Sequence, residues 1–261
     1  MSQEGAQGAA DPADVTWERE GDHVAVVCLH RPPNNFFDVA LVEGLASAYE
    51  ELAGTDWCRS LVLASEGKHF CAGLDFAGNG GQDIGALYEA AVRLFAAPLP
   101  VVAAVRGAAV GGGCGLALSA DFRVASPRSR FSANFSQLGF HQGFALTATL
   151  PAAVGAQAAA DLLLTGRRVG GEEALSLGLC DRLVEEGQER AGAVGYAGEL
   201  AAAGPLAVRA IRATLRHGLV DAVRQAMAHE QAEQIRLRDT NDFAEGVRAM
   251  AERRAPRFTA T

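Results

Sequence analysis

Apolar residues recur at two different spacings along the chain, and each spacing predicts one kind of element. Short runs that are apolar or alternate with polar residues predict β-strands. These runs are Val15–Glu20, His23–His30, Ser60–Ala64, Val101–Val105 and Phe122–Ala125. Gly21 and Asp22 form a turn pair between the first two runs and predict a hairpin. The runs at 60–64 and 101–105 are continuously apolar, which is typical of buried strands.

Apolar residues three or four positions apart predict helices. Asp38 can cap a helix that runs to about Ala53, and Ile84–Phe95 has the same period. Past Pro151 most of the chain has a helical period, in Gly171–Leu177, Gln188–Ala203, Pro205–His217, Leu219–Arg238 and Asp242–Arg253. Strands that alternate with helices indicate an α/β fold with a mixed sheet.

The pattern divides the chain into three expected parts. Residues 1–14 form a polar tail rich in Ala and Gly, which we expect to be disordered and which has no signal-peptide pattern. Residues 15–200 form the α/β core. Residues 201–261 form a helical region that either packs on the core or contacts other subunits. Within the core, Gly78 to Gly85 include four glycines and predict a loop over a site.

Composition narrows the classes of partner. The 261-residue chain has a net charge of −8, which argues against nucleic acid as a partner because phosphate binding needs clustered cations. No apolar run approaches the ~20 residues of a membrane span. Five cysteines without a C-x-x-C pair fit reduced thiols in the cytoplasm. Cys71 and Cys114 can be read as nucleophiles, but small apolar packing residues are the more frequent case. No ligand spacing predicts a metal.

Two glycine-bearing segments are the main candidates for chemistry. Cys71–Asp75 and Gly111–Gly115 each follow a strand-like run and lead toward a helix. A helix that begins at such a turn leaves its first N–H groups unpaired, at the positive end of the helix dipole. Two of these N–H groups aimed at one carbonyl oxygen would polarise it toward an enolate, as an oxyanion hole does.

The order of these motifs resembles the crotonase superfamily, the enoyl-CoA hydratase/isomerase family. The matching segments are Leu29–Asn35, Ser60–Ser65, Phe70–Asp75, Pro100–Gly107 with Gly111–Cys114, Ala120-Asp121, Phe243–Gly246 and Arg254–Phe258. The resemblance implies repeated ββα units and a helical C-terminal trimerisation region. It also implies a homotrimer or a dimer of trimers, and an acyl-CoA substrate whose coenzyme A is part of the substrate and not a separate cofactor.

The resemblance assigns roles to individual positions. The N–H groups of Leu74 and Gly112 would hold the thioester carbonyl. Coenzyme A would lie along the stretch from Arg31 to Asn35 and along the first glycine segment. Its candidate contacts are Arg31, Pro32, Lys68, Ala72, Asp75 and Phe76. Arg257 of a neighbouring subunit is a further candidate for phosphate contact.

The chain departs from the hydratase pattern at the positions that carry acids. Family hydratases use two glutamates, and the matching positions here are Gly115 and Phe135. Some relatives instead place an aspartate at the position of Gly143. None of these three residues can transfer a proton, so hydration by two glutamates is not expected.

Four other residues are candidates for proton transfer or substrate contact. His141 and Gln142 follow Gly139 on a loop that the family folds over the acyl group, and an imidazole titrates near neutral pH. Tyr88 and Glu89 lie on the helix after the glycine-rich loop, and helical spacing lets only one of the two face inward.

These residues leave two functions open. The first is an enzyme that stabilises a thioester enolate as an isomerase, a decarboxylase or an atypical hydratase. The second is an acyl-CoA-binding protein without catalysis. A Ser or Cys hydrolase is disfavoured because the chain has no G-x-S-x-G elbow.

Overall fold

The computed structural model describes residues 14–75 and 83–261, so the predicted tail and most of the predicted loop at Gly78–Gly85 lie outside the described residues. The strands are β1 (Val15–Glu20), β2 (Val24–Leu29), β3 (Ser60–Ser65), β4 (Val101–Val105), β5 (Ala108–Val110), β6 (Phe122–Ala125), β7 (Arg130–Ser132), β8 (Arg168–Gly170) and β9 (Arg182–Leu183). The α-helices are α1 (Val39–Ala53), α2 (Ile84–Ala96), α3 (Gly112–Ser119), α4 (Leu146–Val154), α5 (Ala156–Thr165), α6 (Gly171–Leu177), α7 (Glu189–Ala202), α8 (Pro205–Leu215), α9 (Leu219–Arg238) and α10 (Asn241–Ala251). The predicted α/β fold class is confirmed.

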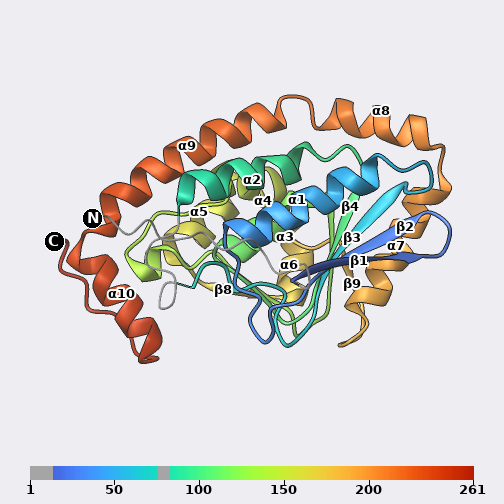
Figure 1. Cartoon of the computed structure of the whole chain (residues 1–261). Coiled ribbons are helices and arrows are strands. Elements are labelled where there is room, and N and C mark those ends of the chain that lie inside the picture. The colour runs from blue at the N-terminus through green and yellow to red at the C-terminus, as the bar shows by residue number, and fades with distance from the viewer. Residues whose placement is uncertain (1–13, 76–82) are drawn as a thin grey trace.

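A large sheet in the order β1-β2-β3-β4-β6-β9 forms the centre of the fold (Figure 1). The β1–β2 hairpin is antiparallel, and the remaining neighbours pair in parallel. Every residue of β2 and β4 is buried, because helices cover both faces. Helix α7 packs on one face of the large sheet through the small residues Ala193, Ala197 and Ala201. Helix α1 packs on the other face, and α2 packs against α1.

A second sheet, with the order β5-β7-β8, was not predicted from the sequence. Each of its strands has three residues, too few for an alternating pattern to stand out. Helices α4 and α5 were also missed, and Pro151 lies inside α4 and not at a helix boundary. Parallel pairing of β5 with β7 places the start of α3 beside residues 132–135.

The C-terminal helices agree with the sequence prediction to within two residues at each end. Helix α9 lies along α2 and α4 at one side of the molecule (Figure 1). Helix α8 has no fully buried side chain, and Leu206 and Leu215 are each 81% exposed. Among the described residues, no helix combines the length and apolarity needed to span a membrane.

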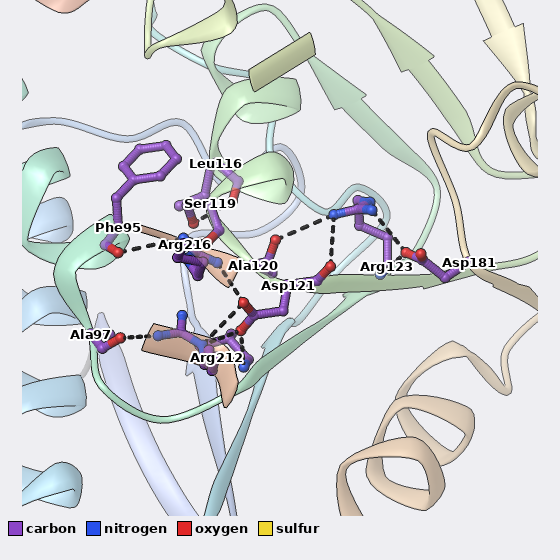
Figure 2. A network of polar contacts seen from close by, with 11 residues as sticks. Phe95, Ala97, Leu116, Ser119, Ala120, Asp121, Arg123, Asp181, Arg212 and Arg216 are labelled. Atoms are coloured by element: carbon purple, nitrogen blue, oxygen red, sulfur yellow. Dashed lines mark hydrogen bonds and ion pairs between the residues drawn. The ribbon is translucent and has the colours of Figure 1, made fainter. Parts of the chain in front are cut away.

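Helix α8 is attached to the core chiefly through a polar network around Asp121 (Figure 2). The Asp121 carboxylate accepts from the guanidinium of Arg212 at 2.9 Å and pairs with that of Arg216 at 2.6 Å. It also accepts from the backbone N–H of Val101 at 2.8 Å. One carboxylate therefore joins α8 to the first residue of β4.

The same network holds the C-terminal end of α3. Arg216 donates to the backbone oxygen of Ser119 (3.2 Å), and Arg123 donates to that of Ala120 (3.2 Å). Arg123 is in turn paired with Asp181 at 2.9 Å. Cations at these carbonyls satisfy groups that a helix leaves unpaired and oppose the negative end of its dipole. Helix α3 is thus fixed at the end opposite its glycines.

We expect Asp121→Asn to lower the free energy of unfolding by about 3 kcal/mol, because it leaves two largely buried guanidiniums without their carboxylate. Glu50→Gln is the matched control, since it breaks the more exposed Arg93–Glu50 pair and should cost under ~1 kcal/mol. Urea denaturation measures both values. Equal losses in the two variants would contradict a structural role for the network.

Candidate active site

The two glycine segments lie side by side. Residue 71 pairs with β5 in parallel: the Cys71 N–H donates to the Ala108 oxygen (3.1 Å), and the Cys71 oxygen accepts from the Val110 N–H (2.9 Å). Strand β5 leads directly through Gly111 into α3. This pairing brings Gly73 to the N-terminal end of α3.

Glycine is required on both sides of this contact. Gly73 has a φ of +80°, and a Cβ there would lie 2.9 Å from the Val110 oxygen. A Cβ on Gly113 would lie 2.1 Å from the Cys71 oxygen. These obstacles are backbone atoms that cannot rotate aside, so any larger residue would push the two segments apart.

The N–H groups of Leu74 and Gly112 are the candidate donors of the expected oxyanion hole. Both residues line one cavity of about 190 Å³, and within residues 14–75 and 83–261 neither N–H donates to a protein acceptor. Gly112 is the first residue of α3, so its N–H lies at the positive end of the helix dipole. The Gly73 oxygen accepts from Phe37 N–H at 3.0 Å, and the N–H of a trans peptide points opposite to its carbonyl. The Leu74 N–H is therefore turned away from Phe37.

Other atoms occupy the space where the resemblance expects carboxylates. A Cβ on Gly115 would lie 2.6 Å from the Phe144 oxygen and 2.7 Å from the Phe144 Cβ. Phe135, at the second position, is buried and lines the cavity. A Cβ on Gly143 would lie 2.3 Å from the Tyr88 hydroxyl. Phe144 crowds position 115, and the side chains of Tyr88 and Gln234 crowd position 143, so a carboxylate could not be placed at either without moving them.

Tyr88 is the titratable group of the cavity. Among the described lining residues, no other carries an ionisable side chain, and the sequence of residues 76–82 contains none. Its hydroxyl donates to Gln234 Oε1 at 3.0 Å and accepts from the Phe144 N–H at 3.4 Å. Burial, followed by the negative charge of Glu230, raises the pKa of Tyr88. The phenol is therefore protonated at neutral pH and does not act as a base there.

The structure does not bring Glu89, His141 or Gln142 to the cavity. Glu89 is exposed, since it follows the inward-facing Tyr88 on α2. The His141 Nδ1 bonds to the Gln142 oxygen at 2.8 Å, and the Gln142 amide donates to Thr147 Oγ1 at 3.1 Å. Their loop presents Gly143 and Phe144 to the cavity instead. Sequence position alone does not determine which side of a loop faces inward.

Two residues of α9 that the sequence interpretation missed hold this loop in place. Gln234 Nε2 donates to the backbone oxygens of His141 (3.1 Å) and Gln142 (3.3 Å). Glu230 accepts from the backbone N–H groups of Ala145 (2.9 Å) and Thr147 (2.8 Å), at the start of α4. Burial raises the pKa of Glu230 against the effect of these bonds. The sequence does contain a signal for their burial. Glu230 and Gln234 follow the apolar residues Val223 and Met227 at helical spacing, and so lie on the same buried side of α9.

The candidate coenzyme A contacts have different surroundings. Arg31 pairs with Asp14 (2.8 Å) and Asp38 (2.7 Å), so its charge is already compensated within the chain. Lys68 and Pro32 are exposed, whereas Asp75 is partly buried and Ala72 lines the cavity. Phe76 lies outside the described residues. The backbone N–H of Arg257 donates to Glu245 (2.9 Å). Of this set, Ala72 lies at the cavity itself.

The cysteines are not set up as nucleophiles. All five are buried as free thiols. Burial raises the pKa of Cys71 to about 12 and that of Cys114 to about 12, so neither forms a thiolate at neutral pH. No group of three potential metal ligands occurs among the described residues.

The fold and the paired glycine segments define a protein of the enoyl-CoA hydratase/isomerase class. The sequence matches the family model described as enoyl-CoA hydratase/isomerase over residues 19–261, and the chain belongs to this family. The resemblance to the crotonase superfamily is therefore confirmed.

Individual relatives cover nearly the whole chain. A putative enoyl-CoA hydratase of Thermus thermophilus is 36% identical over 92% of this chain and 98% of its own length. The (E)-benzylidenesuccinyl-CoA hydratase of Thauera aromatica is 32% identical over 91% of this chain and 96% of its own. The crystal structure of an enoyl-CoA hydratase/isomerase from Pseudoalteromonas atlantica superimposes with a TM-score of 0.84 at 29% identity, over 94% of this chain and all of the other.

We expect Gly115→Glu to lower the free energy of unfolding by at least ~2 kcal/mol, because the new side chain meets the Phe144 backbone. Gly195→Glu is the matched control, since Gly195 lies on the exposed side of α7 and a Cβ there meets nothing within 4 Å. Chemical denaturation compares the two. If Gly115→Glu lowers the free energy of unfolding no more than its control does, position 115 has room for a carboxylate side chain, and the steric argument for this position is wrong.

Proposed function

We propose that this protein is an acyl-CoA-processing enzyme that forms a thioester enolate and holds its oxygen between the N–H groups of Leu74 and Gly112. The observation that carries this proposal is that Leu74 and Gly112 line one cavity at the start of α3 and that neither N–H donates to an acceptor in the part of the chain that the structure describes. Membership of the enoyl-CoA hydratase/isomerase family and the names of the relatives support a coenzyme A thioester as the ligand.

Because Tyr88 is the one ionisable side chain among the described lining residues, one type of reaction is favoured over the others. Hydration needs a base to activate water, and isomerisation needs a base to remove a proton. Tyr88, with a raised pKa, is a poor base. Decarboxylation of a malonyl-type thioester needs only enolate stabilisation and one proton donor. We therefore favour decarboxylation over isomerisation and atypical hydration.

The proposed step balances with the residues present. The bond between the α-carbon and the carboxylate breaks, and carbon dioxide leaves. The electron pair of the broken bond moves into the thioester and forms the enolate. Leu74 and Gly112 hold the enolate oxygen. The Tyr88 phenol then gives its proton to the α-carbon, and the phenolate recovers a proton from water. Gln234, which bonds to the Tyr88 hydroxyl, holds the phenol in position.

A second function, an acyl-CoA-binding protein without catalysis, is favoured by one observation. The described lining residues include no carboxylate and no imidazole, and a binding protein needs neither. The oxyanion hole would then serve only to orient the thioester.

We also propose how the protein assembles and where in the cell it is located. A homotrimer or dimer of trimers would cover the exposed apolar side chains Leu206, Ile211 and Leu215 of α8. Five unpaired buried cysteines fit the reducing cytoplasm. Coenzyme A would enter as part of the substrate, with no separate cofactor.

Tyr88→Phe is expected to slow turnover by about 10²- to 10⁴-fold while leaving coenzyme A binding largely unchanged, because it removes the proton donor together with its bonds to Gln234 and Phe144. Tyr49→Phe is the control: Tyr49 is also buried, but its hydroxyl has no hydrogen-bond partner among the described residues and lies outside the cavity lining. His141→Ala should also retain turnover. Wild-type turnover should stay constant between about pH 6 and pH 9, because the raised pKa keeps Tyr88 protonated throughout.

Incubation with methylmalonyl-CoA, crotonyl-CoA and a 3-enoyl-CoA, followed by mass spectrometry, provides the measurement. Loss of turnover in Tyr88→Phe alone supports the proposed acid. Equal turnover in Tyr88→Phe and the wild type would exclude Tyr88 as the proton donor. Tight binding with no turnover of any of the three substrates would favour the binding protein.

A further inference from the structure

The wall of the cavity is aromatic and carries no charge. Its apolar side chains include Phe37, Leu87, Phe135, Leu138, Phe140 and Phe144. The rings of Phe37 and Phe144 pack with centroids 5.1 Å apart. Among the described lining residues there is no Asp, Glu, Lys, Arg or His. A second charged group on the acyl chain, beyond the carboxylate that leaves in the proposed reaction, would lose its hydration and gain only uncharged polar partners such as Asn134 and Gln234.

The size of the cavity limits what can enter it. Its volume is about 190 Å³. An apolar protein cavity of ~150 Å³ is large enough to bind benzene. The space beside Leu74 and Gly112 therefore accommodates one six-membered ring and a short linker. A chain of ten carbons is larger than one ring with a short linker and does not fit wholly inside this volume.

One wall of the cavity is held firmly in place. Gly143 and Phe144 belong to that wall, and α9 secures their loop through the four hydrogen bonds of Glu230 and Gln234 described above. Gly143 is also in close contact with Tyr88 and Gln234, since a Cβ there would lie 2.3 Å and 2.5 Å from their polar atoms. Widening the cavity at this wall would require breaking these contacts.

From these three observations we infer that the cavity selects coenzyme A thioesters whose acyl group carries a neutral, ring-sized apolar substituent, such as a phenyl group. This inference rests on the proposed function for the placement of the thioester at Leu74 and Gly112. It goes further in naming the chemical class of the acyl group. Burying one ring should tighten binding about 10- to 100-fold over a thioester without it.

Calorimetric titration with four probes tests this selectivity without requiring turnover. The probes are acetyl-CoA, phenylacetyl-CoA, decanoyl-CoA and succinyl-CoA. Phenylacetyl-CoA should bind at least about tenfold more tightly than each of the other three. Decanoyl-CoA binding as tightly as phenylacetyl-CoA would overturn the size limit. Succinyl-CoA binding as tightly would overturn the requirement for a neutral group.

A pair of variants on one helix links the selectivity to the cavity wall. Leu87 and Leu94 lie two turns apart on α2 and are each 1% exposed, but only Leu87 lines the cavity. Leu87→Ala should strengthen decanoyl-CoA binding about fourfold for each additional methylene group that enters. Leu94→Ala should leave all four affinities unchanged. An equal effect in both variants would show that general loosening of the core, and not the cavity wall, determines binding.

The inference and the proposed function fail in different ways. If phenylacetyl-CoA is preferred but no substrate turns over, the proposed reaction is wrong and the selectivity stands. If substrates turn over but the four probes bind equally, the reaction stands and the inferred class of acyl group is wrong.

Discussion

The close approach of two backbone segments, residues 71–74 and the start of α3, is the constraint on which the site depends. Pairing of Cys71 with β5 sets their register, and glycines at 73 and 113 allow contact distances that no other residue permits. The arginines around Asp121 hold α3 at its other end. The N–H groups of Leu74 and Gly112 are thus positioned by backbone pairing and helix anchoring, and no side chain has to place them.

The candidate oxyanion hole consists of main-chain atoms, so the side chains at 115, 135 and 143 do not form it. This chain has Gly, Phe and Gly at these positions, where the family resemblance expects acids in hydratases or in other relatives. Phe144 and Tyr88 lie close to Gly115 and Gly143. The cavity is lined mainly by apolar side chains, which in our proposal favours holding an enolate over activating water.

Sequence patterns predicted five strands of the large sheet and the C-terminal helices, because these depend on apolar period. The family resemblance assigned Leu74 and Gly112 to one site, and both line the same cavity. Sequence patterns did not predict the small sheet, whose strands are three residues long. They also missed Gln234 and Glu230, whose roles arise only when α9 packs against α2 and α4, far away in sequence. Local spacing located the loop at 139–143 but did not show that Gly143, and not His141, faces the cavity.

The central claim is that two backbone N–H groups polarise a thioester carbonyl. Infrared difference spectroscopy of bound acetyl-CoA, with and without ¹³C at the carbonyl, measures this polarisation directly and requires no turnover. Hydrogen bonds from Leu74 and Gly112 weaken the carbonyl bond, so its stretching band should move to lower frequency than in water. A band at the same frequency as in water, or at a higher one, would contradict the presence of an oxyanion hole.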